Sequence, residues 1–166
     1  MHPLITLTLS LFMAQTLLYA NEHYLLPEQK SDLIHTLKRK IERAQTVSII
    51  TSQLESSTLD RSIQKLLKRD GNFTLITTSQ SSAAYYAKYK NTKVYIPEGK
   101  RPPAPFHIVI LLIDHSDVCI ASLPFHDEQL RRAHGTVICT TSQEEVDFAT
   151  KAITRYSERF KSYHAP

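Results

Sequence analysis

The segment from Pro105 to Phe125, PFHIVILLIDHSDVCIASLPF, places a few polar side chains among long apolar runs. His107 stands near its start, Asp114 comes seven residues later, and Ser122 follows a second apolar run. An imidazole at the end of a strand can act as a nucleophile or as a general acid or base. The same residues also have structural interpretations: a hydrogen-bonded histidine, an Asx-turn aspartate and a strand-end hydroxyl that binds the backbone. Residue types alone leave both interpretations open.

The rest of the chain alternates between helical and strand patterns. Apolar side chains at helical spacing predict helices over 31–45, 56–71, 81–90 and 142–160. Short apolar runs predict strands over 46–52, 73–77, 93–96, 106–113, 117–123 and 135–141. Ser57 with Asp60, and Ser142 with Glu145, have the spacing of a capping box. This order predicts an α/β fold with a mixed central β-sheet flanked by helices, in which a proline-rich loop over 97–105 leads to His107.

The first twenty residues differ sharply from the rest of the chain. They contain no Lys, Arg, Asp or Glu and are apolar from Leu4 to Ala20. We interpret residues 1–20 as a signal peptide, which would send the protein to the periplasm or outside the cell. The alternative is an uncleaved anchor, with membrane association through residues 4–20. A tether over 21–30 and one globular domain over 31–163 are expected to follow.

The net charge favours anionic partners. The chain has 20 Lys and Arg against 16 Asp and Glu, a net charge of +4, and all of these residues follow residue 20. Such a balance favours nucleic acid or an anionic membrane surface. The basic groups KRK (38–40), KLLKR (65–69) and KYKNTK (88–93) are also typical of solvated helix faces.

Two cysteines, Cys119 and Cys139, each lie inside a strand-like run. They would pair in an oxidising compartment, and the alternative is two buried free thiols. Neither has a metal-ligand partner at the usual spacing. The later histidines and their neighbouring aspartates also fit no common ligand pattern, so no metal or cofactor is expected.

The order of these elements, with a histidine opening a strand after a proline-rich loop, resembles the phospholipase D superfamily. The likeness is to its small single-motif members, bacterial endonucleases with an export signal, and runs over roughly 33–160. The diagnostic motif of that family is HxKxxxxD. His107 and Asp114 have the motif spacing, whereas the lysine position is Val109.

A second family segment, GSxN, corresponds here to ASLPF (121–125). Ser122 matches the family serine, Ala121 replaces the glycine and Pro124 replaces the asparagine. His134 stands where family members often carry a glutamate that orients the catalytic histidine. The spacing is that of the family, but three polar residues of its site are replaced.

The resemblance implies roles for these positions. In the family, the histidine attacks a phosphodiester, a second histidine protonates the leaving oxygen, and the lysine and asparagine bind the non-bridging phosphate oxygens. The aspartate is more architectural than chemical, and no metal is needed. Loss of one oxyanion donor typically slows such reactions by about 10²- to 10³-fold, so two losses would leave little turnover.

Other side chains are candidates to replace the missing groups. Asp127 or Glu128 could orient His107. The basic residues that could bind phosphate instead are Lys100, Arg101, Arg131 and Arg132.

These observations support three hypotheses. The first is an exported protein that binds a phosphodiester or anionic ligand in a degenerate site, with little or no turnover. The second is an active, metal-independent phosphodiesterase or endonuclease that uses His107. The third is a periplasmic structural or assembly partner. The resemblance further implies a homodimer and either nucleic acid or a phospholipid headgroup as partner.

Overall fold

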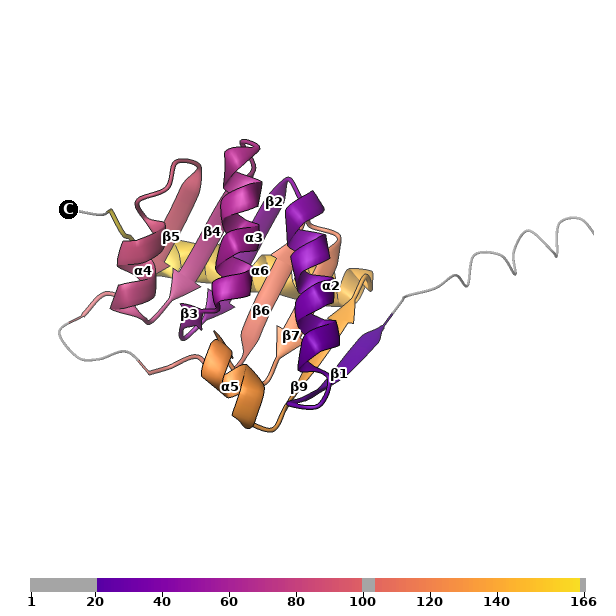
Figure 1. The fold of residues 1–166 in the computed structure, drawn as a ribbon. Helices are drawn as coiled ribbons and strands as arrows, with labels where there is room; N and C mark the ends of the chain where they lie inside the picture. Colours follow the sequence, from indigo (N-terminus) through magenta and orange to yellow (C-terminus); the bar gives the residue numbers. More distant parts are fainter. Residues whose placement is uncertain (1–20, 100–103, 165–166) are drawn as a thin grey trace, which may run out of the picture.

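The computed structural model describes residues 21–99 and 104–164 of the chain. Their centre is an eight-stranded sheet (Figure 1). From one edge to the other its strands are β1 (Glu22–Leu26), β9 (Gly135–Thr140), β7 (Asp117–Ala121), β6 (Val109–Ile113), β2 (Thr46–Thr51), β4 (Asn72–Thr77), β5 (Thr92–Ile96) and β10 (Lys161–Ser162). Strands β2, β4 and β5 are parallel to one another and the remaining pairings are antiparallel. The predicted α/β fold with a mixed sheet is confirmed.

Helices cover the two faces of this sheet unequally. On one face lie α2 (Lys30–Arg43), α3 (Ser57–Lys68), α4 (Gln80–Tyr86) and α5 (Asp127–Arg132). The long helix α6 (Gln143–Arg159) lies alone behind the sheet in Figure 1. Helix α2 buries Leu33, Leu37 and Ile41, which recur at the helical period and pack against the sheet. The predicted helices and main strands are therefore present, with shifted ends.

The expected tether is wrong for residues 22–26, which form the edge strand β1. This strand pairs with β9 in antiparallel register, with Tyr24 opposite Val137. Tyr24 and Leu26 alternate into the core, and the Tyr24 hydroxyl donates a hydrogen bond of 3.0 Å to Thr36 on α2. Because alternate side chains of a strand share one face, this short stretch gains both a buried face and a partner strand.

Three local predictions need correction. Strand β6 begins at Val109, so His107 lies in a bend before the strand instead of opening it. Helix α3 has Ser56, not Ser57, as its N-cap residue. Ser142 is the N-cap residue of α6, but its side chain makes no capping hydrogen bond. Neither capping box is formed, and at the start of α3 the Ser57 hydroxyl binds Asp127 on α5 instead.

Cys119 and Cys139 lie directly opposite each other on β7 and β9, are fully buried and form a disulfide. Of the two alternatives, the structure has the paired one. No helix in the described part of the chain is long and apolar enough to cross a membrane. The predicted signal peptide over 1–20 and the candidate residues Lys100 and Arg101 lie outside the described residues.

Candidate functional site

The site expected from the motif lies where the central strands of the sheet end. Strand β6 runs antiparallel to β2, so the start of β6 at Val109 lies beside the end of β2 at Thr51. Strand β4 ends at Thr77 on the same side. We call this side of the sheet, defined by the carboxyl ends of β2 and β4, its carboxyl end. In open α/β sheets, ligands bind where parallel strands end. His107 precedes β6 at the carboxyl end of the sheet, and its side chain is exposed.

The position that carries lysine in the family's motif is part of the core here. Val109 is 1% exposed and packs on the face covered by α2 and α3. Its branched side chain has no hydrogen-bond donor for a phosphate oxygen. Pro124 likewise has no side-chain donor. Neither replacement can perform the phosphate-binding role that the family's lysine and asparagine imply.

Ser122 is engaged with the neighbouring strand. Its Oγ accepts a hydrogen bond of 3.0 Å from the Thr136 N–H, and its own N–H donates to the Thr136 carbonyl at 3.0 Å. These two bonds hold the start of β9 against the end of β7. The geometry is that of a strand-end hydroxyl bound to the backbone.

Asp114 lies at the opposite end of β6 from His107. Ile108 and the five residues of β6 separate the two, and β6 alone spans about 17 Å. Its carboxylate accepts hydrogen bonds from the N–H groups of Gln45 at 2.8 Å and Thr46 at 2.7 Å, where β2 begins. Asp114 also has φ of 49°, a left-handed conformation that aspartate tolerates in turns. It therefore organises the turn after β6 and the start of β2.

The two candidate arginines lie on the short helix α5. Arg132 forms an exposed ion pair of 3.2 Å with Glu128. Arg131 donates to the Asp127 carbonyl and lines a hollow of about 490 Å³. Lys30 and Lys38 from α2 line the same hollow. Arg131 thus lies in one hollow with two lysines of α2. Arg132 is instead paired with the carboxylate of Glu128.

Asp127 is bound to α3. Its carboxylate accepts hydrogen bonds from the Ser57 N–H at 3.1 Å and the Ser57 hydroxyl at 2.9 Å. Burial raises the pKa of Asp127, but the hydrogen bonds from Ser57 outweigh burial, so its pKa is lowered overall. Asp127 therefore caps α3 from a distant helix. Since Asp127 and Glu128 have these other partners, neither is bound to His107 within the described residues.

The structure also brings together a carboxylate and a histidine that the sequence did not single out as a pair. Strands β3 (Leu54–Glu55) and β8 (Phe125–His126) form a small parallel sheet. His126 Nδ1 accepts the Glu128 N–H at 3.2 Å, and its Nε2 lies 3.4 Å from Glu55. Such a pair can hold an imidazole in one tautomer or exchange a proton. No local signal predicts it, because both strands have two residues and are distant in sequence.

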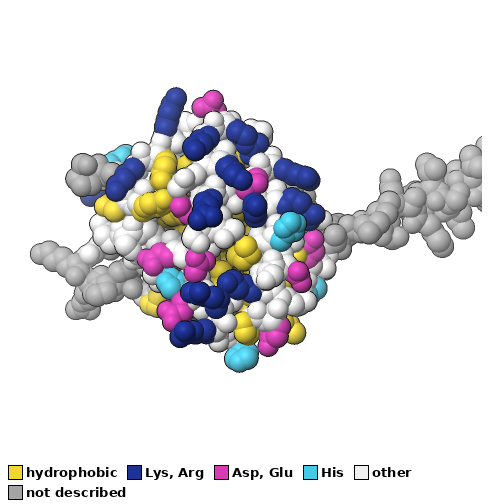
Figure 2. Space-filling model, viewed as in Figure 1, with side chains coloured by type: hydrophobic (Ala, Val, Ile, Leu, Met, Phe, Trp, Pro, Cys, Tyr) yellow, Lys and Arg dark blue, Asp and Glu magenta, His cyan; other side chains and the backbone are white. Residues whose placement is uncertain are grey.

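Positive charge gathers on α2 and α3. These two helices carry eight Lys and Arg against three Asp and Glu, a net charge of +5 in a chain whose total is +4. The remainder of the chain is thus close to neutral. Figure 2 shows dark blue side chains spread over this side of the molecule. We call the exposed Lys and Arg of α2 and α3 the basic helical face.

Comparisons with known proteins place this fold. No family model and no curated protein matches the chain in sequence. Among solved structures, NucT from Helicobacter pylori has a TM-score of 0.77 at 19% identity, with 88% of this chain and 100% of NucT covered. Nuc from Salmonella typhimurium, a phospholipase D family member, has a TM-score of 0.73 at 10% identity, with 88% and 99% covered.

A third similar structure is the archaeal chromatin protein TrmBL2, described as having a novel mode of DNA binding. Its TM-score is 0.59 at 16% identity, with 96% of this chain and 61% of TrmBL2 covered. The chain therefore has the phospholipase D fold. The resemblance drawn from the His107–Asp114 spacing is confirmed at the level of the fold, and the match spans nearly the whole length of both NucT and Nuc, as the small single-domain branch predicts.

Proposed function

We propose that this protein binds nucleic acid and has a degenerate phospholipase D-like site, with little or no hydrolysis of the phosphodiester. The observation that carries the proposal is the burial of Val109, at 1% exposure, in the position of the family's lysine. With Pro124 in the position of the asparagine, the two donors for phosphate oxygens are missing together. His107 alone would attack a phosphate whose developing charge is not stabilised.

The basic helical face supports nucleic acid as the anionic ligand. A net charge of +5 on two neighbouring helices attracts a phosphate backbone and releases its counterions. The exposed large apolar side chains that would favour a lipid surface do not lie on α2 or α3 within the described residues. TrmBL2 illustrates that a similar fold occurs in a DNA-binding chromatin protein.

The test measures hydrolysis and binding in parallel. The purified protein and the His107→Ala variant are incubated in EDTA with a chromogenic diester and with plasmid DNA. We expect equally low hydrolysis by both proteins, together with DNA binding that weakens steeply as salt rises. Metal-independent hydrolysis that disappears in His107→Ala would instead establish an active phosphodiesterase. Absence of DNA binding at low salt would leave the assembly-partner hypothesis.

We further propose that the protein forms a homodimer through the side of the sheet that α6 only partly covers. Its exposed apolar residues are Leu25, Ile108, Ile138 and Phe148, each between 42% and 60% exposed. Next to them, Phe106 and Ile108 line a hollow of about 320 Å³ against α6. A second copy would remove this apolar surface from water. Light scattering on the wild type and Phe148→Lys should report a dimer and a monomer, respectively.

We also propose that residues 1–20 direct export. The Cys119–Cys139 disulfide supports this proposal, because such bonds persist mainly in oxidising compartments. Fractionation of cells that produce the full chain should find it in the periplasm, in the medium or on the membrane. Recovery of the protein in the cytoplasm would contradict export.

A further inference from the structure

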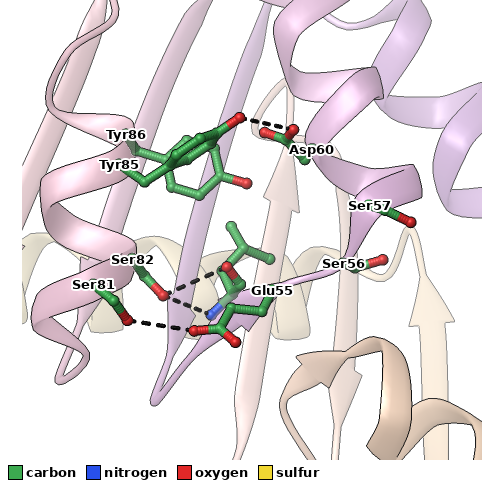
Figure 3. Close-up of a pocket in the computed structure, with 9 residues that line it drawn as sticks. Glu55, Ser56, Ser57, Asp60, Ser81, Ser82, Tyr85 and Tyr86 are labelled. Carbon is green, nitrogen blue, oxygen red and sulfur yellow. Dashed lines mark hydrogen bonds between the residues drawn. The ribbon is translucent and has the colours of Figure 1, made fainter.

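A cavity of about 410 Å³ lies between β3, the first turns of α3, and α4 (Figure 3). Its walls include Leu54 and the side chains of Tyr85 and Tyr86. Two carboxylates, Glu55 and Asp60, also line it, and the set of lining residues contains no Lys, Arg or His. In a chain with a net charge of +4, this cavity is therefore locally acidic.

Asp60 has one oxygen that is satisfied and one that is not. Oδ2 accepts hydrogen bonds from the Tyr85 hydroxyl and from Gln64 Nε2, both at 2.9 Å. Oδ1 is buried and has no hydrogen-bond partner within the described residues. A buried carboxylate oxygen without a partner is costly, so a donor from outside the chain is expected to reach it.

Tyr86 supplies a second polar group to the same space. The residue is 1% exposed, and its hydroxyl takes no part in the hydrogen bonds that join Tyr85 and Gln64 to Asp60 Oδ2. Figure 3 shows this hydroxyl pointing into the cavity, on the side facing Asp60 and Glu55. Burial, followed by the nearby Asp60 charge, raises the pKa of Tyr86 well above its ordinary value. The hydroxyl is therefore protonated at neutral pH and can both donate and accept.

Of the other polar groups that line the cavity, the Ser56 hydroxyl is buried without a hydrogen-bond partner, whereas the hydroxyls of Ser81 and Ser82 are engaged. Ser82 Oγ is bound to the Leu54 backbone, and Ser81 Oγ donates to Glu55 at 3.3 Å. Glu55 stays at the mouth with its side chain 43% exposed. Asp60 therefore lines the cavity and has one buried carboxylate oxygen without a partner, and Glu55 adds a second, more exposed carboxylate.

We propose that this cavity binds a small organic cation, a primary ammonium group carried on a short apolar body. The ammonium would donate hydrogen bonds to Asp60 Oδ1 and to the Tyr86 hydroxyl, while Leu54 and the tyrosine rings contact the apolar part. A divalent metal fits less well, because only one carboxylate oxygen is free at depth and such ions need several oxygen ligands. This proposal does not rest on the phosphodiester-binding function proposed above.

Calorimetric titration with benzylammonium chloride, beside the neutral probe benzyl alcohol, tests the proposal on the full chain at neutral pH. We expect benzylammonium to bind and benzyl alcohol to bind at least about ten-fold more weakly, because charge pairing with Asp60 is absent for the alcohol. Equal binding of both probes would show an apolar pocket only and would overturn the proposal. No benzylammonium binding up to the millimolar range would also overturn it.

Variants locate the binding. Asp60→Asn should weaken benzylammonium binding by about ten-fold or more, and Tyr86→Phe by a smaller factor. Asp70→Asn is the matched control: it removes a carboxylate just after α3, at a φ of 59° that asparagine tolerates. Unchanged binding in Asp60→Asn would overturn the proposal. If that variant does not fold, Tyr86→Phe and amide chemical shifts at residues 54–60 and 81–86 decide the outcome. DNA binding by these variants reports the proposed function separately.

Discussion

Val109 limits phosphodiester hydrolysis at the motif positions, because it stands where the family's motif has a lysine. In this chain it is one of the buried residues that hold β6 against the helices on the α2 side. The same position in the family's motif carries a cation that faces a phosphate. A lysine here would have to leave the core or bring its charge into it, and either change disturbs the packing.

We expect Val109→Lys to lower the free energy of unfolding by about 2–4 kcal/mol, because an unpaired charge would enter an apolar site. Val109→Met is the control for added length without charge, and it should cost less. Urea unfolding measures both. Equal stability of the two variants would mean that the side chain at position 109 reaches the solvent at the carboxyl end of the sheet. Adding Pro124→Asn and assaying diester hydrolysis would then test whether the site can be restored.

Asp114 connects two strands through its carboxylate. Asp114→Ala should destabilise the protein by about 1–3 kcal/mol, because the N–H groups of Gln45 and Thr46 lose their acceptor. Asp114→Asn should recover most of this stability, since its amide oxygen accepts the same bonds and asparagine tolerates φ of 49°. Thermal unfolding compares the three proteins. An alanine variant as stable as the wild type would contradict the architectural role.

The sequence revealed part of the site and could not reveal the rest. The spacing of His107 and Asp114 was visible because the motif is local and lies on one strand. The Asp60–Tyr86 cavity was not, because its residues are distant in sequence and meet only through packing of α3 against α4. The Glu55–His126 pair depends likewise on a long-range register.

Helix α3 is capped by a residue from another helix. The sequence predicted a local capping box from Ser57 to Asp60, but Ser57 donates to Asp127 on α5, and Asp60 faces the cavity instead. Local spacing identifies which residues are suited to capping. It does not identify the acceptor that the folded protein places next to each of these residues.

Asp127→Ala should cost about 1–2 kcal/mol at neutral pH, because two hydrogen bonds at the start of α3 are removed. The pKa of Asp127 is lower in the folded protein than in the unfolded chain. Its stabilising contribution is therefore complete above the unfolded pKa of about 3.9 and is lost as pH falls through the folded value. Unfolding curves at several pH values should show the stability difference shrinking below about pH 4. A pH-independent difference would contradict this ionic contribution.

Helices and longer strands were readable from periodicity, whereas the short strands were not. Helix α2 and strands β2 and β4 have the apolar patterns that define their buried faces. Strand β1 was missed because two buried side chains give too weak an alternation beside a polar turn. Strands β3 and β8 have two residues each, and only their mutual pairing defines them.

At the scale of the whole molecule, the excess of positive charge and most of the exposed large apolar side chains lie on opposite faces of the sheet. The basic helical face covers one side of the sheet, whereas the exposed residues Ile138 and Phe148 lie on the side of α6. This segregation allows one face to contact a polyanion while the other contacts a second copy. The two proposed contacts therefore do not compete for the same surface.

Removal of charge from the basic helical face should reduce the salt dependence of DNA binding. Lys38→Gln with Arg39→Gln should weaken binding and lower the magnitude of the slope of log K against log salt by about 0.9 for each duplex phosphate that the variant no longer neutralises. Lys151→Gln on α6 is the control, because it removes the same type of charge from the opposite face. Fluorescence anisotropy with a labelled duplex measures the slopes. An equal effect of the control would mean that net charge alone matters.

The first and last strands in the described part of the chain form the two edges of the sheet, and this has a consequence for the order of folding. Strand β1 near the amino end pairs with β9, and β10 near the carboxyl end pairs with β5. On a chain that emerges amino end first, β1 has no partner until β9 has been synthesised. Strand β7 also waits for β9, so an interrupted chain exposes unpaired backbone on both strands. Aggregation of nascent chains should therefore fall sharply once residue 140 has been added.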